Sequence, residues 1–222
     1  MHLDTPRLTI RNFTQEDAAD LQEILGDAQT MEYSEPPYDL EKTKQFLSSF
    51  CIERGGGVAA VHRETNKVIG YILFSQIQPG EYELGWFFNR QFWRQGYAFE
   101  ACHAVIEYAF DILGAKKVFS ETIDGVKSVA LMEKLGMELE EIQPDPEHGW
   151  QWYVYAIHRV RTPLKKCSLT ADDGASPPLE WCTHSAEMVH GGRWRGAPGR
   201  HAGNHSGIPL RFRMDSPSIW MV

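Results

Sequence analysis

A chain of 222 residues with 42% hydrophobic and 12% aromatic content can bury one hydrophobic core, and it contains no apolar run long enough to span a bilayer. Its formal net charge of −8 argues against nucleic acid as a partner and is compatible with a cationic substrate. The N-terminal sequence MHLDTPRL lacks the basic start and apolar centre of a signal peptide, and the four cysteines form no close pair. We therefore expect a cytoplasmic protein without a membrane partner.

The first half of the chain predicts two helices and four strands. Alternating residues over 7–13 predict a strand, and a capping residue followed by apolar residues at helical spacing predicts a helix after it. Asp39 can cap the second helix. Strands over 58–61 and 68–74 are joined by a polar turn, and another strand begins at Glu81. We expect these three strands to pair in sequence order as a meander.

The segment 30–38 joins the two predicted helices and contains two prolines, which exclude a helix interior. Its Tyr33, Glu35 and Tyr38 are suited to holding an ammonium group by charge and by cation–π contact. An ordinary surface loop would explain the prolines equally well, so both interpretations stay open.

The second half predicts the order strand, helix, strand, helix and two final strands. A strand over 81–88 ends in a short loop that opens into a helix. The buried face of this helix is marked by Ala98, Cys102, Val105, Ala109 and Ile112. A strand over 118–122, a short helix capped by Asp124, and strands over 137–142 and 152–158 follow. This run predicts a mixed α/β sheet with helices on both faces.

The segment Arg94–Ala98 lies where the loop after the strand over 81–88 opens into its helix. The first amide N–H groups of a helix have no intrahelical partner and carry the positive end of the helix dipole, so such a turn can bind phosphate. Gly96 lets the backbone approach a bulky anion, and the small Ala98 keeps the first helical turn uncrowded.

Residues 93–98, WRQGYA, resemble the pyrophosphate-binding loop of the GNAT superfamily of N-acetyltransferases, whose signature is Gln/Arg-x-x-Gly-x-Gly/Ala. Trp93 departs from the first position of that signature. Together with Gly-Tyr-Ala and Glu100 it is similar to the RimJ/RimL-like branch, which acetylates protein N-termini and various small amines. The resemblance covers roughly residues 4–160.

Residues 128–137, SVALMEKLGM, resemble a second family segment, Ser-x-x-x-x-Glu-Lys-x-Gly-Phe, whose helix lies beside the pantetheine and the cofactor sulfur. Two family features are missing. Gly125 stands where this branch commonly has Asn, which removes one hydrogen bond to the cofactor. Met132 stands where many members have the Tyr that protonates the leaving thiolate.

The resemblance implies a GNAT-like mixed, mostly antiparallel sheet of six to seven strands with about four helices, in a domain spanning residues 1–162. It implies acetyl-CoA as co-substrate, no metal, and direct attack by a primary amine, either a protein N-terminus or a small molecule, in a ternary complex. A catalytically silent acyl-CoA-binding module is the alternative, because the family's Tyr and Asn are missing. A monomer and a homodimer both remain open.

The cofactor-binding residues implied by the resemblance are the end of the strand before the loop, the loop itself and one helix residue. They are Trp86, Phe87, Phe88, Arg94, Gln95, Gly96, Tyr97, Ala98 and Ser128. Family members separate two parallel strands at a bulge in this strand, which exposes backbone N–H groups. Gly85 is the candidate for that bulge or for a close approach of another group to the backbone, since a glycine inside a strand otherwise lowers stability.

Glu83 is the candidate general base, because it lies on the strand that carries the expected bulge. The alternatives are a solvent-facing carboxylate in a salt bridge, or Glu81 on the same strand face as the base. Ser128 either hydrogen-bonds the cofactor or donates a proton to the thiolate, or it caps its helix. Glu100 lies one turn into a helix whose N-terminus favours acids, so a structural role is expected.

The composition changes at Pro163. Residues 163–222 hold 7 of the 19 Gly and 6 of the 12 Pro and show no sustained apolar period. We expect this tail to be disordered and to contribute nothing to catalysis; a frameshift or read-through in the gene is another explanation of its origin. Its possible metal ligands do not have the spacing of a zinc site. These residues are Cys167, Cys182, His184 and His190.

Overall fold

A computed structural model describes residues 1–146 and 148–159 of the chain. The tail predicted to be disordered, residues 163–222, lies outside the described residues, and so do its cysteines and histidines.

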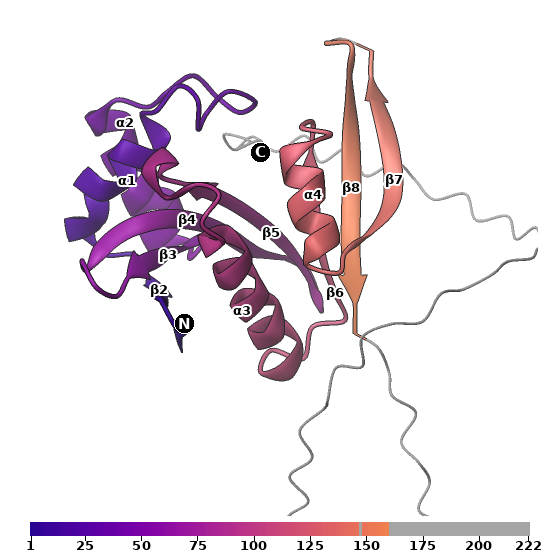
Figure 1. Ribbon diagram of the computed structural model, residues 1–222, viewed down its shortest axis with the longest axis horizontal. Helices are drawn as coiled ribbons and strands as arrows, with labels where there is room; N and C mark the ends of the chain where they lie inside the picture. The colour runs from indigo at the N-terminus through magenta and orange to yellow at the C-terminus, as the bar shows by residue number, and fades with distance from the viewer. Residues whose placement is uncertain (147, 160–222) are drawn as a thin grey trace, which may run out of the picture. The chain divides into compact units, whose positions relative to one another are not determined.

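The described residues form one eight-stranded sheet in which the strands follow the order β1-β2-β3-β4-β5-β6-β8-β7 (Figure 1). The strands are β1 (His2–Asp4), β2 (Leu8–Asn12), β3 (Gly57–His62), β4 (Lys67–Gln78), β5 (Glu81–Phe88), β6 (Lys117–Thr122), β7 (Glu138–Asp145) and β8 (Trp150–His158). All neighbouring pairs are antiparallel except β5 and β6, which run parallel. The predicted mixed, mostly antiparallel sheet is confirmed, and the short edge strand β1 brings the number of strands to eight.

Four α-helices lie in the described part of the chain, and they cover both faces of the sheet, as predicted. They are α1 (Ala18–Leu25), α2 (Leu40–Phe46), α3 (Tyr97–Asp111) and α4 (Lys127–Lys134). Side chains of α3 and α4 pack in one hydrophobic core, and those of α1 and α2 pack in a second core. Alternation along β5 contributes to both, since Trp86 and Phe88 point into the first core and Phe87 points into the second. None of the helices in residues 1–146 and 148–159 is long and apolar enough to cross a bilayer.

Two helices, α2 and α4, are capped at their N-termini by the side chains that the sequence indicates. An oxygen of Asp39 accepts a hydrogen bond of 2.8 Å from the amide of Lys42 at the start of α2. The carboxylate of Asp124 accepts hydrogen bonds of 3.0 to 3.2 Å from three successive amides at the start of α4. Both predicted caps are confirmed, and each satisfies amides that a helix end otherwise leaves without a partner.

Helix α3 buries most of its predicted face. Cys102, Val105 and Ala109 have no exposed surface. Ile112 does not belong to this face, because the helix ends at Asp111 and the side chain of Ile112 is 69% exposed. The chain then turns at Gly114, whose φ of +68° is a conformation that glycine adopts without strain.

Strands β5 and β6 separate after a short stretch of pairing. Their parallel register covers only Glu81–Glu83 opposite Lys117–Phe119, whereas β5 continues to Phe88. Beyond that point β6 remains paired with β8, and Figure 1 shows β5 diverging from β6 and β8. The register between β4 and β5 runs without a shift from Tyr82 to Phe88. The predicted bulge at Gly85 is therefore wrong: the opening arises because the parallel pairing ends, and the pairing with β4 is undisturbed.

Candidate functional site

The end of β5 presents backbone amides at the edge that β6 leaves. The amide of Asn89 donates a hydrogen bond of 2.8 Å to the carbonyl of Ile69, on the β4 side. Because amides alternate in direction along a strand, those of Trp86 and Phe88 point away from β4, and that of Phe87 points toward it. Of the three strand residues predicted to bind the cofactor, Trp86 and Phe88 thus present their amides at the open edge. Phe87 contributes a buried side chain to the core beside α1 and α2.

Trp93 fixes the loop that follows β5. Its indole Nε1 donates a hydrogen bond of 2.7 Å to the carbonyl of Phe88. This contact gives a physical role to the residue that departs from the family signature. It also engages the Phe88 carbonyl and leaves the Phe88 amide on the open edge.

The segment predicted to bind phosphate, Arg94–Ala98, which we call the phosphate loop, contains two residues in the left-handed region. Arg94 has a φ of +58° and Gly96 a φ of +83°. The first amide of this helix to donate to a backbone carbonyl is that of Glu100, which lies 3.0 Å from the Gly96 carbonyl. The amides of Tyr97 and Ala98 therefore have no intrahelical acceptor and can face an anion. The side chain of Arg94 is exposed, and within the described residues we find no ion pair for it.

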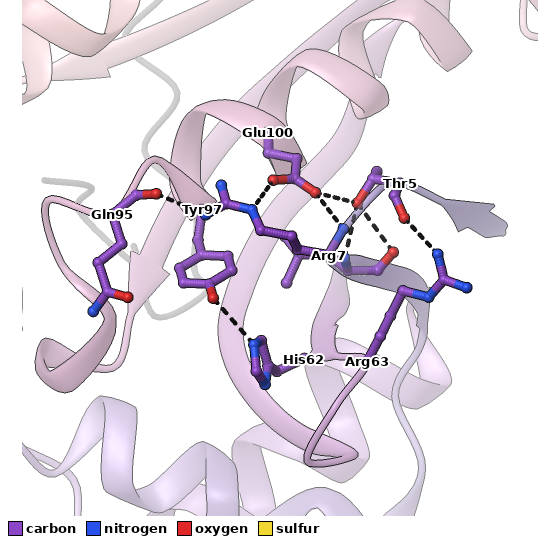
Figure 2. A network of polar contacts seen from close by, with 8 residues as sticks. Thr5, Arg7, His62, Arg63, Gln95, Tyr97 and Glu100 are labelled. Atoms are coloured by element: carbon purple, nitrogen blue, oxygen red, sulfur yellow. Dashed lines mark hydrogen bonds and ion pairs between the residues drawn. The ribbon is translucent and has the colours of Figure 1, made fainter.

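The side chain of Tyr97 is buried, and Figure 2 shows it pointing toward His62. Its hydroxyl lies 3.0 Å from Nε2 of His62, and the guanidinium carbon of Arg7 lies 4.1 Å from the centre of its ring. Tyr97 can thus offer only its backbone amide to a cofactor. Glu100 is hydrogen-bonded by Thr5 and Arg7, which agrees with the structural role expected for it.

The beginning of α4 places Ser128 in a buried position. Ser128 is 4% exposed, and its amide donates to the carboxylate of Asp124. Capping is performed by Asp124, so the interpretation of Ser128 as the cap is wrong. Gly125 leaves room for Tyr153, whose ring would lie 3.2 Å from a Cβ at that position. Met132 is 1% exposed, and its thioether has no proton to donate.

Glu83 is partly buried, and its side chain lies on the sheet face that carries α1 and α2. Burial raises the pKa of Glu83 to about 7, and the negative charge of Glu121 adds to the shift. We find no ion pair for Glu83 in the part of the chain that the structure describes. This environment differs from the solvent-facing, salt-bridged carboxylate that the sequence left open as an alternative.

Glu83 begins a row of three carboxylates across neighbouring strands, which we call the acid row. Glu83 pairs with Phe119 of β6, and Glu121 lies two residues further along the same face. Glu121 and Glu141 are both opposite Val154 of β8, so they flank it. Burial raises the pKa of Glu121, and the charge of Glu141 adds to this, against the opposing effect of a nearby lysine. The acid row consists of Glu83, Glu121 and Glu141, and the raised pKa values of Glu83 and Glu121 mean that these two carboxyl groups resist simultaneous ionisation unless a cation approaches them.

The loop 30–38 is already in contact with an ammonium group of the protein itself, that of Lys42 in α2. Tyr38 is 3% exposed, and its hydroxyl donates a hydrogen bond of 3.1 Å to Glu35. The Nζ of Lys42 lies 2.7 Å from the same carboxylate and 3.9 Å from the centre of the Tyr38 ring. The charge and cation–π contacts predicted for a substrate are thus made by Lys42. A substrate ammonium would have to compete with it.

Lys127, at the start of α4, links three segments that are far apart in the sequence. Its Nζ lies 3.9 Å from a carboxylate oxygen of Glu32, 5.9 Å from the ring of Tyr33 and 6.0 Å from the ring of Trp93. The structure therefore places Tyr33 near the start of α4 and near Trp93, which precedes the phosphate loop. No sequence pattern singled out Lys127, because an isolated lysine at a helix start has many possible surroundings.

Residues 7–138 of the chain match the family described as "Acetyltransferase (GNAT) domain". The chain is 31% identical over 164 residues to the "Uncharacterized N-acetyltransferase YnaD" of Bacillus subtilis (strain 168), covering 71% of this chain and 96% of that protein. It is similar to the crystal structure of a GNAT-family acetyltransferase from Bacillus anthracis, with a TM-score of 0.66 and 27% identity over 71% of this chain and 98% of the other. A spermidine N-acetyltransferase from Vibrio cholerae, solved with CoA and spermine, matches with a TM-score of 0.61 over 69% of this chain and 96% of the other; its identity of 16% shows the fold alone.

Proposed function

The chain belongs to the GNAT acetyltransferase family, and on that premise we propose that it transfers the acetyl group of acetyl-CoA to a primary amine, which attacks the thioester directly in a ternary complex. Members of this family use acetyl-CoA and an amine acceptor. One observation carries the proposal. The pairing of β5 with β6 ends at Glu83 and Phe119, so the amides of Trp86 and Phe88 face an open edge next to the phosphate loop.

The phosphate loop has the features that a pyrophosphate group requires. Gly96, Tyr97 and Ala98 would donate their backbone amides to the phosphate oxygens, and the absence of a side chain at Gly96 allows close approach. Arg94 would add charge from its exposed side chain. The amides of Trp86 and Phe88 would donate to the pantetheine and to the acetyl carbonyl, whose oxygen gains negative charge as the amine attacks.

Glu83 would accept a proton from the attacking amine, directly or through water. Amines are mostly protonated at neutral pH, and only the neutral form has the electron pair that forms the new bond. A base with a pKa of about 7 is half ionised near neutral pH and matches the pH at which it has to work. Ser128 is the candidate proton donor for the leaving thiolate, because Met132 cannot serve and Ser128 lies in the first turn of α4.

The acceptor that fits this site best is a cationic amine. The carboxylates of Glu83, Glu121 and Glu141 lie on one sheet face, and Glu83 has no ion-pair partner among the described residues. A second positive charge on the acceptor would therefore be stabilised there. The WRQGYA segment and Glu100 support the RimJ/RimL-like branch, in which the acceptor is a protein N-terminus or a small amine.

A turnover assay on a panel of small amines, polyamines and peptides, following release of free thiol from acetyl-CoA, tests the proposal. We expect turnover with at least one acceptor, and higher kcat/KM for acceptors with two or more positive charges than for matched monoamines. Binding of acetyl-CoA without thiol release on any acceptor would contradict the enzyme and favour the catalytically silent acyl-CoA-binding module. Failure to bind acetyl-CoA at all would contradict both.

A further inference from the structure

We propose that Arg7 is a positioning residue for the phosphate loop: its guanidinium fixes the peptide between Gln95 and Gly96 so that the Gly96 amide points toward the bound anion. This inference rests on the proposed function, because it concerns how the chain holds the pyrophosphate of acetyl-CoA. Arg7 lies just before β2 and is 88 residues away from Gln95 in the sequence.

The side chain of Arg7 contacts three parts of the loop and helix at once (Figure 2). Its Nη1 donates a hydrogen bond of 2.9 Å to the carbonyl of Gln95, and its Nε donates one of 2.7 Å to Glu100. The guanidinium also stacks over the Tyr97 ring, 4.1 Å from its centre. A Cβ at Gly96 would lie 3.5 Å from Nη2 of Arg7, so the guanidinium runs directly alongside the loop backbone.

The direction of the Gly96 amide follows from this contact. A trans peptide is planar, so its carbonyl and its N–H point in opposite directions, and the described residues contain no cis peptide. When Arg7 holds the Gln95 carbonyl, the Gly96 N–H must point away from Arg7. The next peptide, between Gly96 and Tyr97, is fixed differently, since the Gly96 carbonyl accepts the first helical hydrogen bond, from the amide of Glu100.

The Gln95–Gly96 peptide needs such a contact because of the glycine itself. Glycine adopts positive and negative φ with similar ease, so a peptide next to it can rotate to a different orientation at little cost. Gly96 has a φ of +83°, the conformation that brings its amide to the start of α3. The glycine permits close approach of an anion, and Arg7 keeps its amide in one orientation.

Arg7 is in turn held by Glu100 and the segment before β2. Glu100 accepts hydrogen bonds from the amide of Arg7 at 2.8 Å and from the hydroxyl of Thr5 at 2.7 Å. Although burial acts to raise the pKa of Glu100, the hydrogen bonds from Thr5 and Arg7 lower it below its ordinary value, so the carboxylate stays ionised. The planar guanidinium can bind a carboxylate and a carbonyl simultaneously, which a lysine ammonium on a flexible chain cannot do in the same geometry.

The test compares Arg7→Met, Arg7→Lys and Arg63→Met with the full-length wild type. Arg63 is the matched control, because it is an exposed arginine whose Nη1 donates to the carbonyl of Thr5 at 2.8 Å in the same network but makes no contact with the loop. Binding of CoA is measured by calorimetry. Turnover is measured with two donors that differ in the pyrophosphate, acetyl-CoA and S-acetylpantetheine, on one good acceptor.

We expect Arg7→Met to raise the Kd of CoA roughly tenfold, the size expected for one oriented, charge-assisted hydrogen bond. Its KM for acetyl-CoA should rise in parallel, with little change in kcat and no change in kcat/KM for S-acetylpantetheine. Arg7→Lys should recover only part of the affinity, because it restores the charge without the fork of donors. Arg63→Met should bind CoA like the wild type.

Any other pattern among the variants overturns the inference. Unchanged CoA affinity in Arg7→Met removes the positioning role, and an equal loss with both donors or in Arg63→Met means that Arg7 acts through general stability. Full recovery in Arg7→Lys would show that charge alone suffices. A wild type that does not bind CoA would instead contradict the proposed function, so the two failures are distinguishable.

Discussion

The two sides of the divergence between β5 and β6 are stabilised in different ways. At the phosphate loop, the groups that support the loop are paired within the protein: Trp93 donates to the Phe88 carbonyl, Arg7 donates to the Gln95 carbonyl, and Glu100 accepts from Arg7. On the opposite sheet face, the acid row leaves Glu83 without an ion-pair partner among the described residues, and its pKa is raised to about 7 by burial and by Glu121.

This difference matches the two tasks that we assign to the two regions. A binding site for an invariant group such as pyrophosphate works best when its donors are held in place beforehand, because then little ordering is required on binding. A proton acceptor must instead change its charge during each reaction, and a carboxylate that is already paired with a cation would be a weak base. The contrast predicts that substitutions on the first side change cofactor affinity, and that substitutions on the second change turnover.

The largest effect is expected for Glu83→Gln. Removing the base should lower kcat roughly 100-fold or more, with the Kd of acetyl-CoA unchanged, because the cofactor is held by the other region. Steady-state kinetics and calorimetry measure the two constants. Glu81→Gln is the matched control, since Glu81 lies on the same strand and the same face. A large loss of kcat in Glu81→Gln, with little change in Glu83→Gln, would identify Glu81 as the base.

The next effect concerns Gly96. Gly96→Val should raise the Kd of acetyl-CoA at least tenfold, because a β-branched residue is strained at a φ of +83° and its side chain would obstruct the approach of the anion. Arg94→Ala should raise the Kd of acetyl-CoA at most a fewfold, since an exposed charge contributes about 1 kcal/mol or less to binding. Calorimetric titration of both variants checks this order, and unchanged affinity in Gly96→Val would remove the phosphate-loop assignment.

A smaller effect is expected for Glu121→Gln on the acceptor side. The charge of Glu121 helps to raise the pKa of Glu83, so its removal should shift the acidic limb of the pH–rate profile to lower pH. KM for an acceptor with two positive charges should rise severalfold, and KM for acetyl-CoA should not change. Glu107→Gln on α3 removes the same charge from an exposed position and serves as control. Equal effects of both substitutions would mean that net charge, not the acid row, is responsible.

The smallest effect is expected from removing the tail. We propose that residues 1–162 form the complete acetyltransferase domain, because the family match ends at residue 138 and the described strands end at His158. Truncation after residue 162 should leave kcat, KM and Tm near the full-length values. A large loss of activity or of Tm would show that the tail belongs to the working protein.

The sequence predicted those features that depend on neighbouring residues. The caps Asp39 and Asp124, the glycine at the start of α3 and the strand before it are local patterns, and each is found where it was expected. The order of strands and helices followed from the same patterns. The family resemblance then supplied the interpretation of the phosphate loop, which composition and spacing alone would leave as one possible anion site.

The features that the sequence missed depend on contacts between distant residues. Arg7 meets Gln95 across 88 positions, and Lys127 meets Tyr33 only because the fold brings α4 beside the loop 30–38. The absence of a bulge at Gly85 could not be known before the strand register was known. The neighbourhood of Glu83 and Glu121 likewise depends on where the parallel pairing of β5 and β6 ends, and a sequence pattern does not specify that position.

The pH dependence of turnover in wild type and Glu83→Gln distinguishes a general base at Glu83 from a carboxylate without a catalytic role. Glu83 is protonated below its pKa of about 7 and cannot act as a base there, and the acceptor is neutral without help above its own pKa of roughly 8–10. If Glu83 is the general base, the ratio of wild-type to variant kcat/KM is largest between these two pH values and falls on both sides, with CoA affinity equal in both proteins. A ratio near one at every pH would contradict the assignment of Glu83 as the general base.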